Sequence, residues 1–422
     1  MEEAQHVTKT TVKRSTRVGA AFVMAGVLAA LAGCSGGGGG TQSDGTLDLY
    51  TWVSSESDRQ QWESFVSLAQ EQDPDLKIDI DGPSFADYWT KVKTRLSGSN
   101  PPCLLTTQAA RAQELGPLLK PLDELIADAD FDLSDIDASM LEGMTVDGTI
   151  RAIPYDAEPV VLFYNADMFE AAGLTPPGIT YTRDQFVSDA KTLTTGDQTG
   201  LTISTGIFIP NAWAIADGVT AVNDDGELDL TNPEFVEQVQ SFFDLVGDEG
   251  VAAAPEAADG SDVSQAAFTG GKAAMLIEGP WMYGTFDAAA DFTLGVSIVP
   301  STSGEAAAMT AGSGFGIAET CDDPEAAFKA ITELTATPVL EGQAKTRGIV
   351  PARSEAVPAW AEGKSPEAAA VVDALLANAT AQITTTNWNQ VDTLFTQYGV
   401  EGFRGDKTAE EVLDTIQNSV GE

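Results

Sequence analysis

Two kinds of hydrophobic periodicity alternate along the chain. "TLDLYTW" (46–52) and "DLKIDID" (75–81) alternate apolar with polar residues, as half-buried strands do, whereas "KAAMLIEG" (272–279) is a nearly continuous apolar run. Such a run suits a strand that is buried on both faces of a parallel sheet. The segments between these strands carry apolar residues at helical spacing. The pattern therefore predicts α/β domains with mostly parallel sheets.

Capping residues predict where several helices begin. Ser57 is expected to cap the helix after the first strand, and Ser84 the helix after the second. The face that this second helix buries is predicted to consist of Tyr88, Trp89, Val92 and Leu96. Further helix starts are predicted at Asn232-Pro233, at Asp323-Pro324 and at Thr408, which has Glu411 three residues later.

The first 45 residues predict export and a lipid anchor. Lys9, Lys13, Arg14 and Arg17 precede an uncharged segment, 18–31, which is shorter than the roughly 20 residues that cross a bilayer. The following "LAGC" resembles the lipobox of bacterial lipoproteins, whose cysteine is acylated. We predict a signal peptide over 1–33, lipidation at Cys34, and a Gly/Ser tether over 34–45 that holds the protein at the extracellular face of the cytoplasmic membrane. An ordinary secretory signal is the alternative.

The chain is strongly acidic. It contains 22 Lys and Arg against 64 Asp and Glu, which gives a formal net charge of −42. This charge excludes nucleic acids and anionic lipid head groups as main partners. Because the acidic residues are spread along the sequence, they are typical of a solubilising surface. The hydrophobic content of 43% is enough for two or more cores in a chain of 422 residues.

Histidine and cysteine usage narrows the chemistry. His6, the one histidine, lies in the predicted leader. The mature chain would therefore lack the imidazole that Ser-His-Asp or Cys-His catalysis and His-ligated zinc require, and we predict no metal site and no cofactor. Cys103 and Cys321 lie outside the leader. In an oxidising exterior a disulfide is their simplest use, and two isolated buried thiols are the alternative.

Aromatic and acidic residues lie next to turns at predicted strand ends. "EGPWMYG" (278–284) carries Trp281 and Tyr283, "AGSGFGIAE" (311–319) carries Gly314 and Phe315, and "IPYDAEPVVLFYN" (153–165) carries Asp156 and Glu158. Ligands of open α/β sheets bind at the carboxyl ends of strands. An aromatic ring packs on the apolar face of a sugar, and carboxylates or amides pair with its hydroxyls. These segments therefore predict a carbohydrate site.

Longer segments resemble an extracellular solute-binding protein of the maltose-binding type, family 1, which serves an ABC importer. They are "YTWVSSESDRQQWESF", "AIPYDAEPVVLFYNADMFEAAGL", "FTGGKAAMLIEGPWM", "GSGFGIAETCDDPEAAFKAITEL" and "GIVPARSEA". The resemblance implies a two-lobed, type II periplasmic-binding-protein-like fold with discontinuous lobes joined by a hinge. Lobe 1 would comprise 46–155 and 306–353, and lobe 2 would comprise 156–305 and 354–422. Cys103 and Cys321 both fall in lobe 1, which is compatible with a disulfide.

The resemblance also implies ligand-binding residues. Glu56 matches a polar contact after the first strand, Glu158 the hinge acid, and Trp281 the stacking aromatic of the "GPW" turn. Further family positions match Phe315, Arg347 and Trp388. Thr107 and Gln108 stand where many relatives carry an Asp that binds sugar hydroxyls. The remaining candidates, by proximity to these segments, are Trp52, Tyr88, Asp156, Trp213, Tyr283 and Gly314.

Together these observations predict a monomeric binding protein, not an enzyme. It would capture a di- or oligosaccharide between its lobes and present it to the permease subunits of an ABC transporter. Two alternatives are left open. A glycoside hydrolase would use Asp156 and Glu158 as its carboxylate pair. The same fold would otherwise bind an anionic polyol such as a glycerophosphate, with Arg111 and Arg347 as its cations.

Overall fold

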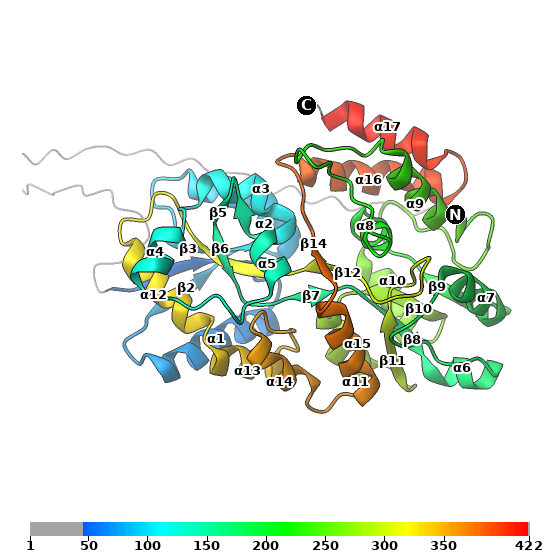
Figure 1. Cartoon of the computed structure of the whole chain (residues 1–422), viewed down its shortest axis with the longest axis horizontal. Coiled ribbons are helices and arrows are strands. Elements are labelled where there is room, and N and C mark those ends of the chain that lie inside the picture. Colours follow the sequence, from blue (N-terminus) through cyan, green and yellow to red (C-terminus); the bar gives the residue numbers. More distant parts are fainter. Residues whose placement is uncertain (1–44, 421–422) are drawn as a thin grey trace, which may run out of the picture. The chain divides into compact units, whose positions relative to one another are not determined.

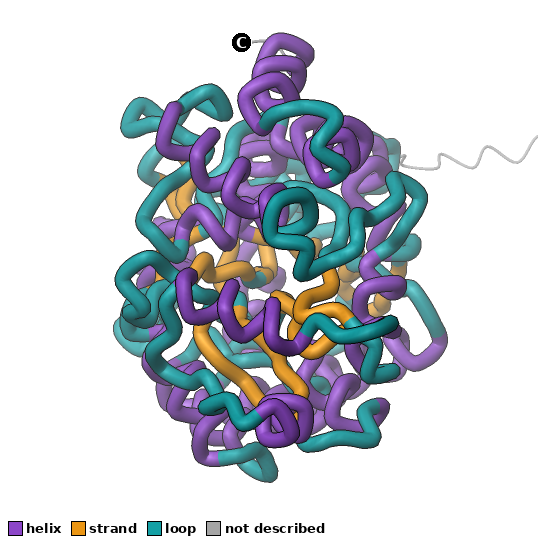
Figure 2. Tube along the Cα trace, turned by 90° about the vertical axis from the view of Figure 1, so that its right-hand side faces the viewer, coloured by secondary structure: helices purple, strands orange, loops and turns teal. Residues whose placement is uncertain are grey.

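The computed structural model describes residues 45–420, whose hydrophobic side chains gather in two cores. We call core A the cluster built from residues 47–157 and 315–356, and core B the cluster built from residues 160–309 and 344–416. Helices lie around the strands of these cores (Figure 2). The lobe boundaries drawn from the sequence stay a prediction.

Core A contains a five-stranded sheet in the order β2-β1-β3-β13-β6. Its strands are β1 (Leu47–Tyr50), β2 (Ile78–Asp81), β3 (Leu104–Gln108), β6 (Ala152–Pro154) and β13 (Ser313–Ile317), and a small ribbon is formed by β4 (Thr145–Val146) and β5 (Thr149–Ile150). Its helices are α1 (Glu56–Gln72), α2 (Phe85–Leu96), η1 (Ala109–Arg111), α3 (Ala112–Leu115), η2 (Gly116–Leu118), α4 (Asp123–Asp128), α5 (Ala138–Gly143), α12 (Pro324–Leu334) and α13 (Thr337–Thr346).

Core B contains a four-stranded sheet in the order β11-β8-β10-β9. Its strands are β8 (Val161–Asn165), β9 (Thr199–Thr202), β10 (Ala273–Glu278) and β11 (Leu294–Ile298). The helices around it are α6 (Ala166–Ala172), α7 (Arg183–Leu193), α8 (Phe208–Ile215), α9 (Pro233–Asp244), α10 (Ser261–Thr269), η3 (Pro280–Met282), α11 (Tyr283–Ala289), α14 (Val357–Ala361), α15 (Pro366–Leu376), α16 (Trp388–Phe403) and α17 (Ala409–Val420). The short helix η4 (Ser354–Ala356) belongs to core A.

A three-stranded connector sheet joins the two cores. Its strands are β7 (Glu158–Pro159), β12 (Ala308–Ala311) and β14 (Ala379–Ala381), in the order β14-β12-β7 (Figure 1). β7 follows β6 of core A and leads into β8 of core B, whereas β12 follows β11 of core B and leads into β13 of core A. Each core is therefore assembled from separate stretches of the chain, and the backbone that joins them is hydrogen-bonded into one small sheet.

The expectation of mostly parallel sheets is corrected by the strand pairing. The parallel pairs are β1·β2, β1·β3, β9·β10 and β12·β14. The pairs β3·β13, β6·β13, β8·β10, β8·β11 and β7·β12 are antiparallel. The sheets are mixed because the strands that follow a connector strand run opposite to their neighbours. β8 is antiparallel to β10 and β11, and β13 is antiparallel to β3 and β6. All six residues of β10 are buried, as its apolar run predicts, but β10 has one parallel and one antiparallel neighbour.

Most of the predicted helix starts are confirmed. Asn232 and Asp323 cap α9 and α12 through their side chains, each with proline as the first helical residue. At α17 the Thr408 hydroxyl accepts from the Glu411 N–H at 3.2 Å, and the Glu411 carboxylate accepts from the Thr408 N–H at 3.0 Å. The prediction for α1 is wrong by two residues, because Ser55 is extended and its hydroxyl accepts from the Asp58 N–H at 3.1 Å.

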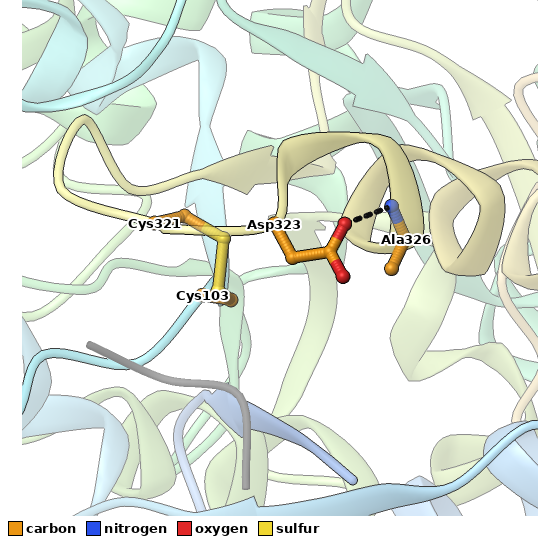
Figure 3. The surroundings of a disulfide bond; sticks show 4 residues. All are labelled: Cys103, Cys321, Asp323 and Ala326. Carbon is orange, nitrogen blue, oxygen red and sulfur yellow. Dashed lines mark hydrogen bonds between the residues drawn. A yellow bond between two sulfur atoms is a disulfide. The ribbon is translucent and has the colours of Figure 1, made fainter. Parts of the chain in front are cut away.

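Cys103 and Cys321 form a disulfide within core A (Figure 3). Cys103 precedes β3, and Cys321 lies between β13 and α12, whose first turn is capped by Asp323. The two cysteines are 218 residues apart in the sequence. The disulfide therefore ties together the two stretches of core A that the insertion of core B separates.

Candidate functional site

The carboxyl ends of three parallel strands place several candidate residues at one edge of the core A sheet. β1 and β2 are parallel, as are β1 and β3. Trp52 follows β1, Phe85 follows β2, and Gln108 ends β3. Arg111 lies one turn further along, in η1. This is the edge where open α/β sheets bind their ligands.

Arg111 is a buried residue whose guanidinium lacks hydrogen-bond partners in the part of the chain that the structure describes. The residue is 8% exposed, and its Nε and Nη1 atoms have no hydrogen-bond partner among the described residues. Its guanidinium carbon lies 5.3 Å from the centre of the Trp89 ring, and the Trp89 Nε1 also lacks a partner there. Burial lowers the pKa of Arg111. Because buried donors in native proteins are nearly always paired, this group of unpaired N–H donors points to a missing acceptor.

The nearest opposite charge comes from core B. The Asp392 Oδ2 in α16 lies 3.8 Å from the Arg111 Nη2, too far for a hydrogen bond. A Cβ on Gly206, in the loop after β9, would lie 3.3 Å from the Asp392 Oδ1, so this carboxylate also contacts the loop that leads to α8. Asp392 therefore connects the carboxyl edge of the core A sheet to that of the core B sheet.

Two aromatic residues lie at the corresponding edge of core B. β9 and β10 are parallel, Phe208 begins α8 after β9, and Trp281 lies in η3 after β10. Their ring centres are 6.3 Å apart, and both residues are half-buried. A Cβ on Gly279 would lie 2.0 Å from the Trp281 ring. Glycine is therefore required at this turn, because the indole packs directly on the backbone there.

Two buried carboxyl groups lie at the connector sheet. Asp156 and Glu158 are 7% and 2% exposed. The Asp156 Oδ1 accepts from the Ser313 N–H, and the Glu158 Oε1 accepts from the Val350 N–H at 3.0 Å. The Glu158 Oε2 is buried without a partner among the described residues. Burial raises the pKa of Asp156 to about 7, and burial together with the nearby Asp156 charge raises the pKa of Glu158 well above its usual value.

Arg347 lies between these acids and the first turn of α1. Its guanidinium carbon is 4.3 Å from the centre of the Trp62 ring, and its Nη2 is 3.6 Å from the Asp58 Oδ1. The Nη1 is buried and has no partner among the described residues. Arg347 therefore has a free donor close to the connector sheet, where the predicted hinge acid Glu158 also has a free acceptor atom.

The structure does not bring Tyr88, Trp213 or Phe315 to this site. Tyr88 is fully buried in core A, where its hydroxyl donates to the Thr106 carbonyl at 2.7 Å. Trp213 is buried in core B, where its Nε1 donates to the Ser241 hydroxyl at 3.0 Å. Phe315 is fully buried against other rings of core A. Their polar atoms and ring faces are used inside the cores.

The other predicted residues lie at or behind the two edges. Glu56 is exposed as the first residue of α1. The Gln108 Nε2 donates to the Ser313 hydroxyl at 3.5 Å. Trp52 is 7% exposed and packs against Phe85. Tyr283 packs against Trp360, and Trp388 is buried one helical turn before Asp392. Gly314 pairs with Thr107 and Pro154 in the core A sheet.

Sequence reasoning missed Phe85 and Asp392 and placed Arg111 only in the anionic alternative. Phe85 carries a usable signal, since it directly follows a predicted strand and a helix cap. Arg111 lies just past the end of β3, where the same rule applies. Asp392 has no such signal, because its approach to Arg111 depends on how a helix of core B meets core A.

The described residues hold no group of three or more His, Cys, Asp or Glu side chains placed to bind a metal ion. Within 45–420, no helix has the length and apolar character needed to cross a membrane. Cys34, the predicted lipidation site, lies outside the described residues.

Comparisons with known proteins agree on a family and a fold. The model of a family described as bacterial extracellular solute-binding protein matches residues 66–372. The mannitol-binding protein of Pseudomonas aeruginosa is 39% identical over 59 residues, which are 14% of this chain and 13% of that protein.

Solved structures match over nearly the whole described chain. The ABC substrate-binding protein Lmo0181 from Listeria monocytogenes, in complex with cycloalternan, aligns with a TM-score of 0.78 and 23% identity, covering 89% of this chain and 97% of that one. Maltose-bound MalE3 of T. maritima aligns with a TM-score of 0.73 and 20% identity, covering 89% and 98%. These matches confirm the predicted two-lobed type II fold.

Proposed function

The chain belongs to the bacterial extracellular solute-binding proteins, and from this premise we propose that it binds a di- or oligosaccharide and delivers it to the permease of an ABC importer. The ligand would lie between the carboxyl edge of the core A sheet and that of the core B sheet. Several similar solved structures hold oligosaccharides, among them cycloalternan and maltose. The protein would change the ligand's location and leave its bonds intact.

The observation that carries this proposal is the unsatisfied pair of Arg111 and Asp392. A buried guanidinium offers up to five N–H donors, and its nearest carboxylate is 3.8 Å away. A sugar hydroxyl can accept from the guanidinium and donate to the carboxylate at the same time. The half-buried rings of Phe208 and Trp281 at the core B edge suit the apolar face of a pyranose. A polyhydroxylated, uncharged guest therefore fits this site better than an anion, which Asp392 would repel.

The mechanism we propose is a shift of a hinge equilibrium. Arg111 belongs to core A and Asp392 to core B, so a ligand that contacts both favours the arrangement in which the two edges approach each other. Its binding free energy is then spent partly on holding the connector sheet in one state. The closed, loaded form would be the one that the permease recognises.

The hydrolase alternative is not favoured by the positions of its two acids. Asp156 and Glu158 both accept from backbone N–H groups of neighbouring segments, which fixes them as parts of the connector. A glycosidase needs two carboxyl groups on opposite sides of the scissile bond, and at least one of them must be free to exchange protons with the substrate. We therefore propose that the protein is not an enzyme.

Export and anchoring complete the proposal. A signal peptide over 1–33, acylation at Cys34 and a glycine-rich tether over 34–45 would hold a monomer at the extracellular face of the cytoplasmic membrane. Mass spectrometry of the mature N-terminus tests this part directly. A mature chain that begins elsewhere than Cys34, or that carries no acyl group, would overturn the anchor without affecting the binding site.

A sugar panel tests the binding proposal. Thermal unfolding of the purified protein is followed with mono-, di- and oligosaccharides and with sugar alcohols, and each hit is measured by calorimetry. A ligand at 100 times its Kd should stabilise the protein by about 2.7 kcal/mol. Trp281→Ala should abolish the shift while its unfolding without ligand stays cooperative. Indifference of the wild-type protein to the whole panel, or turnover of any sugar, would overturn the proposal.

A further inference from the structure

An exposed aromatic ring extends the core A edge beyond Arg111. Phe85 is the first residue of α2 and is 43% exposed, whereas its neighbours Trp52 and Trp89 are each 7% exposed. The Phe85 ring centre lies 5.4 Å from that of Trp52 and 5.7 Å from that of Trp89. Both contacts are edge-to-face, so two indoles hold the ring in place while much of it faces solvent.

The position of Phe85 is fixed by more than ring contacts. Its backbone N–H donates to the Ser54 hydroxyl at 3.0 Å, which ties the start of α2 to the loop after β1. Few large apolar side chains of the described chain are comparably exposed, and Phe85 is the aromatic one among them. Leaving such a ring in water forgoes the free energy of its burial, which is about 25 cal/mol for each Å² of apolar surface.

Phe85 is also continuous with the proposed sugar site. The Arg111 guanidinium lies over the Trp89 ring, and Phe85 packs against that same ring. The hydrogen-bonding group and the exposed ring are therefore separated by one indole. They share the edge formed by the carboxyl ends of β2, β1 and β3.

We propose that Phe85 is an outer stacking platform for a further sugar ring of a ligand whose first ring places a hydroxyl against Arg111 and Asp392. This inference rests on the proposed function and adds a specificity-determining residue to it: Phe85 selects for the chain length of the sugar. A monosaccharide held at Arg111 would not reach Phe85, whereas the next ring of an oligosaccharide would cover it.

A length series on three variants tests the inference. Calorimetry compares glucose, maltose, maltotriose and maltotetraose, and the β-1,4-linked series from cellobiose to cellotetraose, on the wild type, Phe85→Ala, Phe85→Leu and Phe85→Tyr. For the longest ligand that binds, Phe85→Ala and Phe85→Leu should each lower the affinity by about tenfold. The affinity for the shortest ligand that binds should change by less than about twofold. Phe85→Tyr keeps the ring face and should keep wild-type affinity.

The outcomes separate this inference from the proposed function. If oligosaccharides bind but Phe85→Ala and Phe85→Leu leave their affinities unchanged, or lower those of all lengths equally, the platform is wrong while the sugar site stands. The same holds if only monosaccharides or sugar alcohols bind. If no sugar binds the wild type, both proposals fail. Unfolding midpoints of the variants within about 2 °C of the wild type show that the fold is unchanged.

Discussion

Arg111 and Arg183 occupy similar surroundings and differ in one respect, their hydrogen bonds. Each guanidinium lies over a tryptophan ring, at 5.3 Å from Trp89 for Arg111 and at 4.1 Å from Trp213 for Arg183. Each has one aspartate as its ionic partner, and burial lowers the pKa of both, to about 10 for Arg183.

The Arg183 guanidinium is satisfied within core B. Its Nη2 donates to the Trp213 carbonyl at 2.6 Å and lies 3.0 Å from the Asp217 carboxylate, its Nε donates to the Pro300 carbonyl at 3.4 Å, and its Nη1 donates to Gln238. In Arg111, by contrast, the Nε and Nη1 atoms have no hydrogen-bond partner among the described residues. A buried charge whose donors are all paired stabilises the fold, whereas the unpaired donors of Arg111 are available to a ligand.

Arg183→Met should have the largest effect on stability. Removing the guanidinium leaves the Trp213 and Pro300 carbonyls without this donor. It also leaves the Asp217 carboxylate, which keeps its hydrogen bonds from Thr302, without a cation. The free energy of unfolding should therefore fall by about 3–5 kcal/mol. Urea denaturation measures this loss. A fall in the free energy of unfolding of less than about 1 kcal/mol would show that Arg183 is no more important to the fold than Arg111.

Arg111→Met should give the opposite result. Since it removes no protein hydrogen bond that the structure shows, the free energy of unfolding should change by less than about 1 kcal/mol. Ligand affinity should fall by about a hundredfold, which is close to 2.7 kcal/mol. Calorimetry with the best sugar of the panel and urea denaturation measure the two quantities on one protein. A destabilised variant with unchanged affinity would assign Arg111 to the fold.

The buried carboxyl group of Asp156 at the connector sheet should make the stability of the protein depend on pH. The folded-state pKa of Asp156 is about 7, above its value of about 4 in an unfolded chain, so folding favours the protonated carboxyl. The stabilisation is complete below about pH 4 and is lost as the pH rises towards 7, by at most about 1.4 kcal/mol per pH unit for this group. Urea denaturation between pH 4 and 7 should show that slope in the wild type and a flatter one in Asp156→Asn. Equal slopes would contradict it.

Asp392→Asn should have the smallest effect. The carboxylate is 3.8 Å from Arg111 and its side chain is 40% exposed, so loss of its charge should leave the free energy of unfolding within about 0.5 kcal/mol of the wild type. Sugar affinity should fall by about tenfold, because the amide accepts a ligand hydroxyl less strongly than a carboxylate. Unchanged affinity would leave Arg111 as the single polar anchor between the two edges.

Local signals in the sequence predict local structure well. The caps at Asn232, Asp323 and Thr408 are predictable because a side chain and a backbone N–H two or three residues apart meet in any helix. The buried face of α2 follows from helical spacing in the same way. That spacing was a better guide to Tyr88 than its nearness to ligand-binding segments, since its ring and hydroxyl face the core.

Contacts between residues far apart in the sequence could not be predicted from it. An apolar run such as β10 shows that a strand is buried and says nothing about the direction of its neighbours. Likewise Arg111 and Asp392 meet only because the connector sheet brings core A and core B together. No periodicity or motif encodes the distance between them, so half of the proposed site becomes visible only in three dimensions.

The Cys103–Cys321 disulfide also orders events during biogenesis. A chain that emerges from its amino end exposes Cys103 first, and 218 residues of sequence separate it from its partner. At about 5–20 residues per second, tens of seconds of synthesis pass before Cys321 appears. Throughout that interval Cys103 lacks the partner with which it forms the disulfide. The disulfide can therefore form only after the stretch of core B between the two cysteines has been synthesised.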